Sequence, residues 1–224
     1  MWEFLLAGGP FMLLLLLTSL VSVTFIIERG LALRRQKVVP AELETLLAEC
    51  RGREDLPLVQ STCEKGPSTL SRLVSTAMSH LAWPKNDNAN ALQTRARQEI
   101  VSLERGLVVL EVVVGIAPLL GLLGTIHGLM TLFGDLGAAG VSDNAVLARG
   151  IAIALNTTMM GLLIAIPSLV AWSYFTKKVE TLAVELENLL DDLLRRLYRQ
   201  AGTDGRRRST RGGHDSRHDA EEAG

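Results

Sequence analysis

The sequence predicts an all-α integral membrane protein with three transmembrane helices, and two observations support this fold class. Charged residues make up 21% of the 224-residue chain, yet the segments 4–27, 107–133 and 150–175 carry almost none. Each segment exceeds the roughly 20 residues that a helix needs to cross about 30 Å of hydrocarbon. A helix also satisfies all its backbone amides internally, as lipid requires. The remaining chain is too polar to cover three such helices as a soluble core.

The first apolar segment is predicted to be a retained span, so that residues 1–28 form a short outer N-terminus and the first membrane helix. A cleaved signal peptide is the alternative interpretation. Signal peptides begin with basic residues and end at a small-residue cleavage site. Here only Met1, Trp2 and Glu3 precede the apolar run, which ends at Glu28 and Arg29. The sequence therefore favours a span that stays in the membrane.

Basic residues predict the orientation of the three spans. Of the 23 Lys and Arg residues, 12 lie in residues 28–106, 10 lie after residue 175, and the remaining one is Arg149. The loop between the second and third spans, 134–148, otherwise carries only acids. Lys and Arg collect on the cytoplasmic side of membrane proteins. We therefore expect a periplasmic N-terminus and short loop, and a cytoplasmic long loop and C-terminus.

The cytoplasmic loop, residues 29–106, is predicted to be helical. Apolar residues recur at spacings of three and four over 41–50 and 68–81, which is typical of amphipathic helices. Glycines and prolines punctuate the chain between these two helices, and residues 83–87 read as a turn. From about residue 90 a helix is predicted to run without a break into the second span, 107–133.

The third span, 149–176, is predicted to continue as a cytoplasmic amphipathic helix over 177–200. Long helices of the second and third spans would thus extend out of the membrane into the cytoplasm. Residues 201–224 contain no large apolar residues and are expected to be a disordered tail.

Several chemical functions find no support in the sequence. The two cysteines, Cys50 and Cys63, match no metal-binding spacing, and reduced thiols are expected in the cytoplasm. No nucleotide-binding loop or catalytic triad is present. The sequence predicts no enzyme, no catalytic or metal-binding residue, no cofactor and no nucleic-acid partner. Membrane lipid is the expected surrounding.

Small residues form one face of the second span and one face of the third. Such faces let two helices approach closely in lipid, where packing drives association. Close packing alone is one interpretation of these residues, and lining a pore is the other. They are Pro118, Gly121, Gly124, Gly128, Ala154, Gly161 and Pro167.

Polar residues interrupt the same two spans: Thr125 in the second, and Asn156, Thr157 and Thr158 in the third. A lone threonine can bond to its own helix, but an asparagine in a membrane should face protein or water. Together these residues could line a narrow hydrated path. The spans hold one acid, Glu111, near the cytoplasmic end. Any acid deeper in the membrane would have to come from a partner.

Two long motifs resemble the MotA/TolQ/ExbB proton-channel family. Residues 117–130 read APLLGLLGTIHGLM, followed by Phe133, and residues 150–167 read GIAIALNTTMMGLLIAIP. The sequences IER at 27–29 and LERG at 103–106 are also similar to the family. Three spans with the N-terminus outside are similar to the ExbB/TolQ branch, because the MotA branch has four spans.

The resemblance implies a subunit of a proton-motive-force-driven stator in the bacterial inner membrane. Such subunits form a pentamer around two copies of a single-span partner of ExbD or TolR type. The partner brings an aspartate into the pore, and ion flow energises an envelope process such as import across the outer membrane. The family's pore threonines match Thr125 and Thr158. The process that is powered, and the choice between H⁺ and Na⁺, stay open.

One departure from the family pattern is at Ile153, where ExbB and TolQ carry a glutamate. A non-conducting oligomeric scaffold is therefore the alternative function. His127 stands where many relatives have an aromatic residue, and packing is its simplest role, although a histidine could titrate near physiological pH. A solute transporter is disfavoured because the chain shows neither repeated halves nor paired broken helices.

Overall fold

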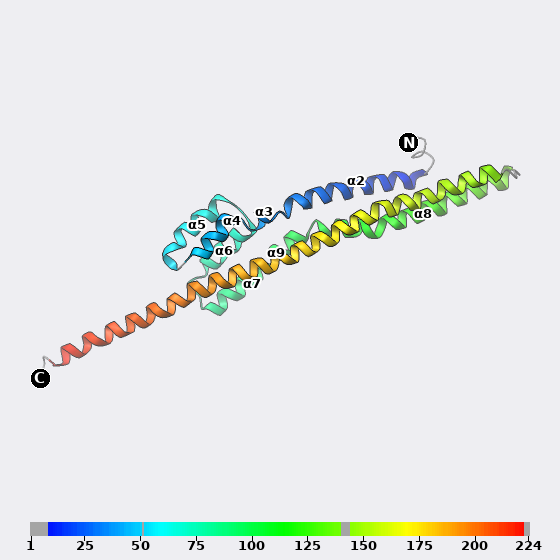
Figure 1. The fold of residues 1–224 in the computed structure, drawn as a ribbon. Coiled ribbons are helices and arrows are strands. Elements are labelled where there is room, and N and C mark those ends of the chain that lie inside the picture. Colours follow the sequence, from blue (N-terminus) through cyan, green and yellow to red (C-terminus); the bar gives the residue numbers. More distant parts are fainter. Residues whose placement is uncertain (1–8, 51, 140–143, 222–224) are drawn as a thin grey trace. The chain divides into compact units, whose positions relative to one another are not determined.

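A computed structural model describes the backbone of residues 9–50, 52–139 and 144–221. Side chains are described over the same ranges up to residue 199, except at 53, 138 and 139. All regular structure in these ranges is helical, which confirms the predicted fold class (Figure 1). The helices are α2 (Gly9–Ala32), α3 (Arg35–Val38), α4 (Ala41–Glu49), η1 (Arg53–Asp55), α5 (Leu56–Lys65), α6 (Thr69–Ser79), α7 (Lys85–Glu104), α8 (Leu107–Ala139) and α9 (Asn144–Glu221).

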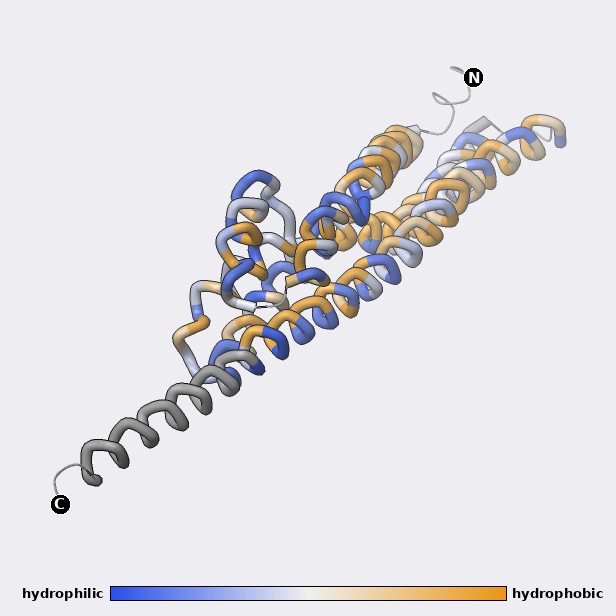
Figure 2. The backbone as a smooth tube through the Cα atoms, turned by 60° about the vertical axis from the view of Figure 1, so that its left-hand side comes forward, coloured by the Kyte–Doolittle hydropathy of each residue, from blue (hydrophilic) through white to orange (hydrophobic). Residues whose placement is uncertain are grey.

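The chain divides into two units. The membrane unit comprises Met1–Leu33 and Leu103–Val179, and the loop unit comprises Arg34–Ser102 and Glu180–Gly224. Three helices of the described chain are long and apolar enough to cross a membrane, and they begin at Gly9, Leu107 and Asn144. Figure 2 shows that α2, α8 and the first part of α9 are rich in hydrophobic residues, drawn in orange. The three predicted membrane-spanning helices are therefore confirmed.

Within the membrane unit, α2 packs along α8. The same helix also reaches α9, because the Oγ atoms of Ser22 and Ser168 lie 2.6 Å apart and form a buried hydrogen bond. Most of the other side chains of α2 remain exposed, including Leu13 at 65% and Leu20 at 63%. Such exposed leucines suit lipid contact, since hydrocarbon solvates them as well as protein does.

The predicted unbroken helix from residue 90 through the second span is wrong. The helix α7 ends at Glu104, a turn occupies Arg105 and Gly106, and α8 begins at Leu107. The guanidinium of Arg29 lies where a Cβ on Gly106 would be. Arg29 also donates from Nη1 to the carbonyl of Leu103 at 3.2 Å, which satisfies a carbonyl at the end of α7. A tertiary contact, invisible to local periodicity, thus sets the break.

The loop unit packs by apolar side chains. The predicted helices over 41–50 and 68–81 are confirmed as α4 and α6, and a capping box between Ser68 and Ser71 begins α6. The sequence missed α5, because Pro57 reads as a breaker although proline is well tolerated in the first turn. The fully buried leucines include Leu33 in the membrane unit, and Leu70, Leu73, Leu186, Leu193 and Leu197 in the loop unit.

Buried polar contacts add to the loop unit. Asn88 of α7 is fully buried and donates from Nδ2 to the carbonyl of Ala77 and to the hydroxyl of Tyr198, each at 3.0 Å. Glu99, also on α7, accepts from Arg72 and Arg95. These bonds fasten α6, α7 and α9 to one another within this unit.

Two predicted boundaries differ from the observed helices. The predicted loop 134–148 is shorter, since α8 reaches Ala139 and α9 begins at Asn144; no proline lies between 134 and 139 to stop the helix. The backbone of α9 is helical to Glu221, whereas the sequence predicts a disordered tail over 201–224. No proline follows Pro167 to end the helix, although each glycine at 202, 205, 212 and 213 disfavours it by about 1 kcal/mol. The side chains there lie outside the described residues, and disorder of the tail stays a prediction.

Candidate functional site in the membrane unit

The small faces of α8 and α9 meet directly. A Cβ added to Gly161 would lie 2.6 Å from the carbonyl oxygen of Ala117, and one added to Gly121 would lie 2.9 Å from the carbonyl oxygen of Thr157. Because the obstructing atoms are backbone, neither glycine can be enlarged without moving a helix. A Cβ added to Gly128 would lie 3.2 Å from the Cβ of Ala154. The two helices therefore touch backbone to backbone, as small residues permit in membranes.

Three threonine hydroxyls gather at this contact. Thr125 on α8 is 9% exposed, and its Oγ1 lies 3.4 Å from that of Thr157 on α9, which is 2% exposed. Thr125 also forms a short hydroxyl–hydroxyl hydrogen bond with Thr158, which is half-buried. The three hydroxyls thus form a continuous chain from Thr157 through Thr125 to Thr158.

Two backbone carbonyls accept hydrogen bonds from the three hydroxyls. The carbonyl of Ala154 accepts from Thr157 at 2.7 Å and lies 3.1 Å from Thr125 Oγ1. The carbonyl of Gly121 lies 3.2–3.3 Å from all three hydroxyl oxygens. Each hydroxyl has one proton and at least two acceptors within reach, so the hydrogen-bond pattern can be rearranged without leaving a donor unpaired. Such a cluster can offer a bond to water or to a carboxylate while staying satisfied.

The other predicted residues lie around this cluster in different ways. Asn156 is half-buried and, within the described part of the chain, makes no side-chain hydrogen bond to the threonines. Gly124 lies inside the contact, where an added Cβ would meet Thr157 Oγ1 at 2.9 Å. Pro118 is half-buried within α8, whereas Pro167 is exposed on α9. The structure thus brings the threonines and glycines together and leaves Asn156 and Pro167 outside the cluster.

Comparison with known proteins places this site in a family. The model of the MotA/TolQ/ExbB proton channel family matches residues 65–188, which is more than half of the chain and includes all three threonines. The chain belongs to this family. The resemblance recognised in the sequence is therefore confirmed, and the protein is an ExbB/TolQ-like membrane protein of a family of channel and transport components.

Individual relatives agree. An ExbB-like biopolymer transport protein of Synechocystis sp. is 32% identical over 176 residues, which are 75% of this chain and 67% of that protein. The TolQ protein of the Tol-Pal system of Haemophilus influenzae is 34% identical over 111 residues, 50% of this chain and 49% of TolQ. The biopolymer transport protein ExbB of Helicobacter pylori is 37% identical over 83 residues, 37% of this chain and 57% of that ExbB. The chain thus spans about half the length of the last two relatives.

A half-open cavity of about 270 Å³ adjoins the threonine cluster. Thr157 lies at one end and Asp135 at the other, and His127 and Ile153, the departure from the ExbB/TolQ pattern, also line it. The ring of His127 lies 5.5 Å from that of Phe11 on α2, in agreement with a packing role for part of its surface. Sequence reasoning missed Thr131 and Asp135, although His127, Thr131 and Asp135 follow one another at a spacing of four, which is a helical signal.

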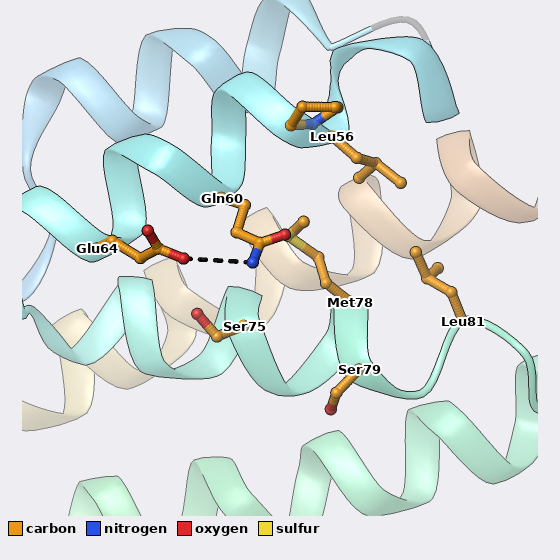
Figure 3. Close-up of a pocket in the computed structure, with 8 residues that line it drawn as sticks. Leu56, Gln60, Glu64, Ser75, Met78, Ser79 and Leu81 are labelled. Atoms are coloured by element: carbon orange, nitrogen blue, oxygen red, sulfur yellow. Dashed lines mark hydrogen bonds between the residues drawn. The ribbon is translucent and has the colours of Figure 1, made fainter.

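The loop unit holds a second cavity, of about 600 Å³, between α5 and α6 (Figure 3). Gln60 donates to Glu64 across its wall at 3.2 Å, and Ser75, Met78 and Leu81 line the opposite side. One carboxylate and scattered apolar side chains do not converge on a ligand. Among the side chains described, no group of three His, Cys, Asp or Glu could hold a metal ion. The threonine cluster is therefore the best candidate site.

Proposed function

We propose that this chain is the ExbB/TolQ-like subunit of an inner-membrane stator that is driven by the proton motive force. It conducts ions together with a single-span partner of ExbD or TolR type and so energises an envelope process such as import across the outer membrane. The observation that carries the proposal is the chain of hydroxyls from Thr157 through Thr125 to Thr158, held between two helices that contact through backbone.

The proposal also depends on the scarcity of carboxylates in the membrane-spanning helices. Within the described spans, Glu111 is the only carboxylate on α8 before Asp135, and it is exposed near the start of the helix. Hydroxyl groups can hydrogen-bond to a permeating ion's water, but at neutral pH they neither give up their own proton nor take up a second one. A carboxylate supplied by the partner opposite Thr158 would complete the path, with Thr125 and Thr158 bonding to it in both protonation states.

The arrangement in the membrane belongs to the same proposal. The distribution of Lys and Arg supports a multi-pass protein with a periplasmic N-terminus and a cytoplasmic C-terminus. The sequence-based limits 1–28, 107–133 and 149–176 for the spans, and 29–106 and 177–200 for cytoplasmic helical parts, go with it. We propose a homo-oligomer, five copies as in the family, around two partner chains. Oligomerisation would bring the Thr158 sides of several α9 helices around one lumen.

The test is the mass of the intact complex. The tagged protein is purified from its native membranes in a mild detergent, and the complex is weighed by native mass spectrometry. We expect five copies of this chain with two copies of a partner that has one span and one intramembrane aspartate. Recovery of this chain alone under several detergents, with the tag at either end, would contradict the proposal.

A non-conducting scaffold is the second candidate, and the isoleucine at Ile153 favours it. A scaffold needs the backbone contacts of Gly121 and Gly161 but not the hydroxyls. Replacing Thr158 with the isosteric valine keeps the volume and removes the hydroxyl. Loss of function with assembly intact supports conduction, whereas full function of Thr158→Val supports the scaffold. Thr24→Val is the matched control, because among the described residues the Thr24 hydroxyl bonds only to the Leu20 carbonyl of its own helix.

A further inference from the structure

A polar stripe runs along α8 beyond the threonine cluster. His127, Thr131 and Asp135 are spaced by four residues and therefore lie on one side of the helix. Thr131 donates its hydroxyl proton to the carbonyl of His127 at 3.0 Å, so it keeps two lone pairs for water. Leucine or valine would be the ordinary residue at such positions in a lipid-facing helix. This stripe has no role in the hydroxyl chain between α8 and α9.

The stripe lines the half-open cavity of about 270 Å³, and the cavity ends at the hydroxyl chain. Its inner end is formed by Gly124 and Thr157, its outer end by Asp135 and Gly150. Gly124 packs closely against Thr157 at this end, because an added Cβ would lie 3.0 Å from the Cβ of Thr157. A space of this size holds several water molecules, and each finds polar partners along the stripe.

We infer that this cavity is a water-filled vestibule through which ions reach the threonine cluster from the outer side, with Asp135 and His127 as the groups that collect them. The inference rests on the proposed function and its orientation, and it adds the entry route within a single subunit. An ion or hydrated proton would enter beside Asp135, pass His127 and Thr131 through cavity water, and arrive at the Thr157 hydroxyl. From there the hydrogen-bonded hydroxyls of Thr125 and Thr158 lead to the other side of the α8–α9 contact.

The charged side chain in the lining of the vestibule is the carboxylate of Asp135. Asp135 on α8 is exposed and, among the side chains described, has no ion-pair partner. On α9 the nearest charged residue is Arg149, which precedes the lining residue Gly150 and is exposed. The lining residue from α2 is Gly9, which is uncharged. A carboxylate at the mouth of a cavity with low-dielectric walls raises the local concentration of cations.

The vestibule also gives a physical meaning to Ile153. This residue lines the cavity from α9, where ExbB and TolQ carry a glutamate. In this chain the titratable groups of the cavity instead come from α8, at His127 and Asp135. The carboxylate of this cavity therefore lies at its mouth, at Asp135, and not at position 153. We therefore expect Ile153 to be accessible to water although it is apolar.

The test uses cysteine accessibility in the full chain in its native membrane. In a background in which Cys50 and Cys63 are serine, single cysteines replace Thr131 or Ile153, and membrane-impermeant methanethiosulfonates are added to the outer side of spheroplasts. The matched controls are Met130→Cys on α8 and Leu155→Cys on α9, which are exposed at 69% and 58% but do not line the cavity. Only a hydrated thiol ionises and reacts, so we expect labelling at 131 and 153 to be at least about tenfold faster than at the controls.

A second measurement tests the charge. The cysteine at position 131 should react faster with a cationic than with an anionic reagent of similar size, beyond the ratio for a free thiol. We expect the Asp135→Asn change to remove this preference, by about threefold to tenfold, because it removes the attracting charge. A preference that survives Asp135→Asn would overturn the assignment of Asp135.

Other outcomes would overturn the inference as a whole. Equal rates at cavity and control positions would mean that the cavity is dry or that the whole face is wet. Labelling of Thr131→Cys from the cytoplasmic side alone would reverse the path. These rates do not depend on ion conduction, so a protein that proves to be a scaffold would still show the vestibule, and a stator with a different entry route would not.

Discussion

The α8–α9 contact of the membrane unit and the core of the loop unit hold helices together in opposite ways. Between α8 and α9, glycines bring backbones together, and the buried side chains at the contact include Thr125 and Thr157 beside the small Ala117 and Ala154. In the loop unit, leucines such as Leu70 and Leu193 fill the core, and charged groups mostly stay at its surface. Apolar side chains gain little free energy by moving from lipid into a helix contact, whereas they gain much by moving out of water into a protein core.

The comparison shows which of the two contacts can hold a row of buried polar side chains. In the loop unit a polar group at the core is expensive unless it is paired. Asn88 Nδ2 and the Glu99 carboxylate bond to neighbouring helices, whereas Asn88 Oδ1 is buried without a hydrogen-bond partner among the described residues. At the α8–α9 contact the hydroxyls lie among backbone carbonyls that accept hydrogen bonds from them. A polar path is therefore tolerated at this contact with little loss of stability. The predictions below separate the two kinds of packing, beginning with the largest effect.

Enlarging Gly161 should disrupt the membrane unit. We expect Gly161→Leu to prevent the α8–α9 contact, because its Cβ already collides with the Ala117 carbonyl, and Gly161→Ala to destabilise by about 1–3 kcal/mol through overpacking. The measurement is thermal unfolding and oligomer recovery in detergent. Gly115→Leu and Gly115→Ala are the controls, since nothing lies within 4 Å of a Cβ at Gly115. Equal effects at both positions would show that this contact does not hold the unit together.

Truncating a buried leucine should damage the loop unit instead. We expect Leu70→Ala to destabilise this unit by about 2–5 kcal/mol, because it removes transfer free energy and leaves a cavity. Leu70 is fully buried, and the control Leu58→Ala changes a leucine that is 57% exposed on α5. Hydrogen exchange of the full-length protein, read by mass spectrometry on peptides of α6 and α7, measures the effect. Unchanged protection in these peptides would refute the leucine-core description.

Neutralising Glu99 should have a smaller effect. Its side chain is 7% exposed and pairs with Arg72 and Arg95, which remain 45% and 42% exposed. Because both arginines can return to water, we expect Glu99→Gln to cost about 1–2 kcal/mol rather than the full cost of a buried unpaired charge. Asp191→Asn, which removes the exposed pair with Arg195, should change stability by less than about 0.5 kcal/mol. The same hydrogen-exchange experiment distinguishes them, and a larger effect at Asp191 would contradict the ranking.

The two thiols should be slow to react in the folded loop unit. Burial raises the pKa of Cys50 and of Cys63 above the ordinary thiol range, so the reactive thiolate is scarcer than in a free thiol at pH 8. Both are free and buried. We expect slow alkylation by iodoacetamide in the native protein and complete alkylation once it is unfolded in SDS. Rapid labelling of the native protein would mean that the unit opens.

Sequence patterns predicted most of the helices, because the charge and spacing of side chains depend on whether lipid, water or protein surrounds a segment. Long uncharged runs predicted the spans, and leucine spacing predicted α4 and α6. The motifs also singled out Thr125 and Thr158, which the structure brings together with Thr157. Asn156 shares α9 with Thr157 and Thr158, yet among the described side chains it makes no hydrogen bond to the cluster, which sequence spacing alone does not reveal.

What the sequence missed depends on contacts between distant residues. The break between α7 and α8 lies where the guanidinium of Arg29 contacts Gly106, and these two residues are 77 positions apart in the sequence. Pro57 lies in the first turn of α5, where proline is tolerated, and therefore does not break the helix. The cavity that joins Asp135 to Thr157 needs two helices and the beginning of α2. Neither hydropathy nor periodicity along one segment contains this information.

The most direct test of the central claim is ion flux through the complex purified from its native membrane and reconstituted in liposomes. A pH gradient and a membrane potential are imposed, and proton uptake is followed with a trapped pH dye for the unmodified protein, Thr158→Val and Thr24→Val. We predict that Thr158→Val abolishes flux while the mass of the complex is unchanged, and that Thr24→Val conducts normally. Equal flux in the unmodified protein and Thr158→Val would contradict a path along the threonine cluster.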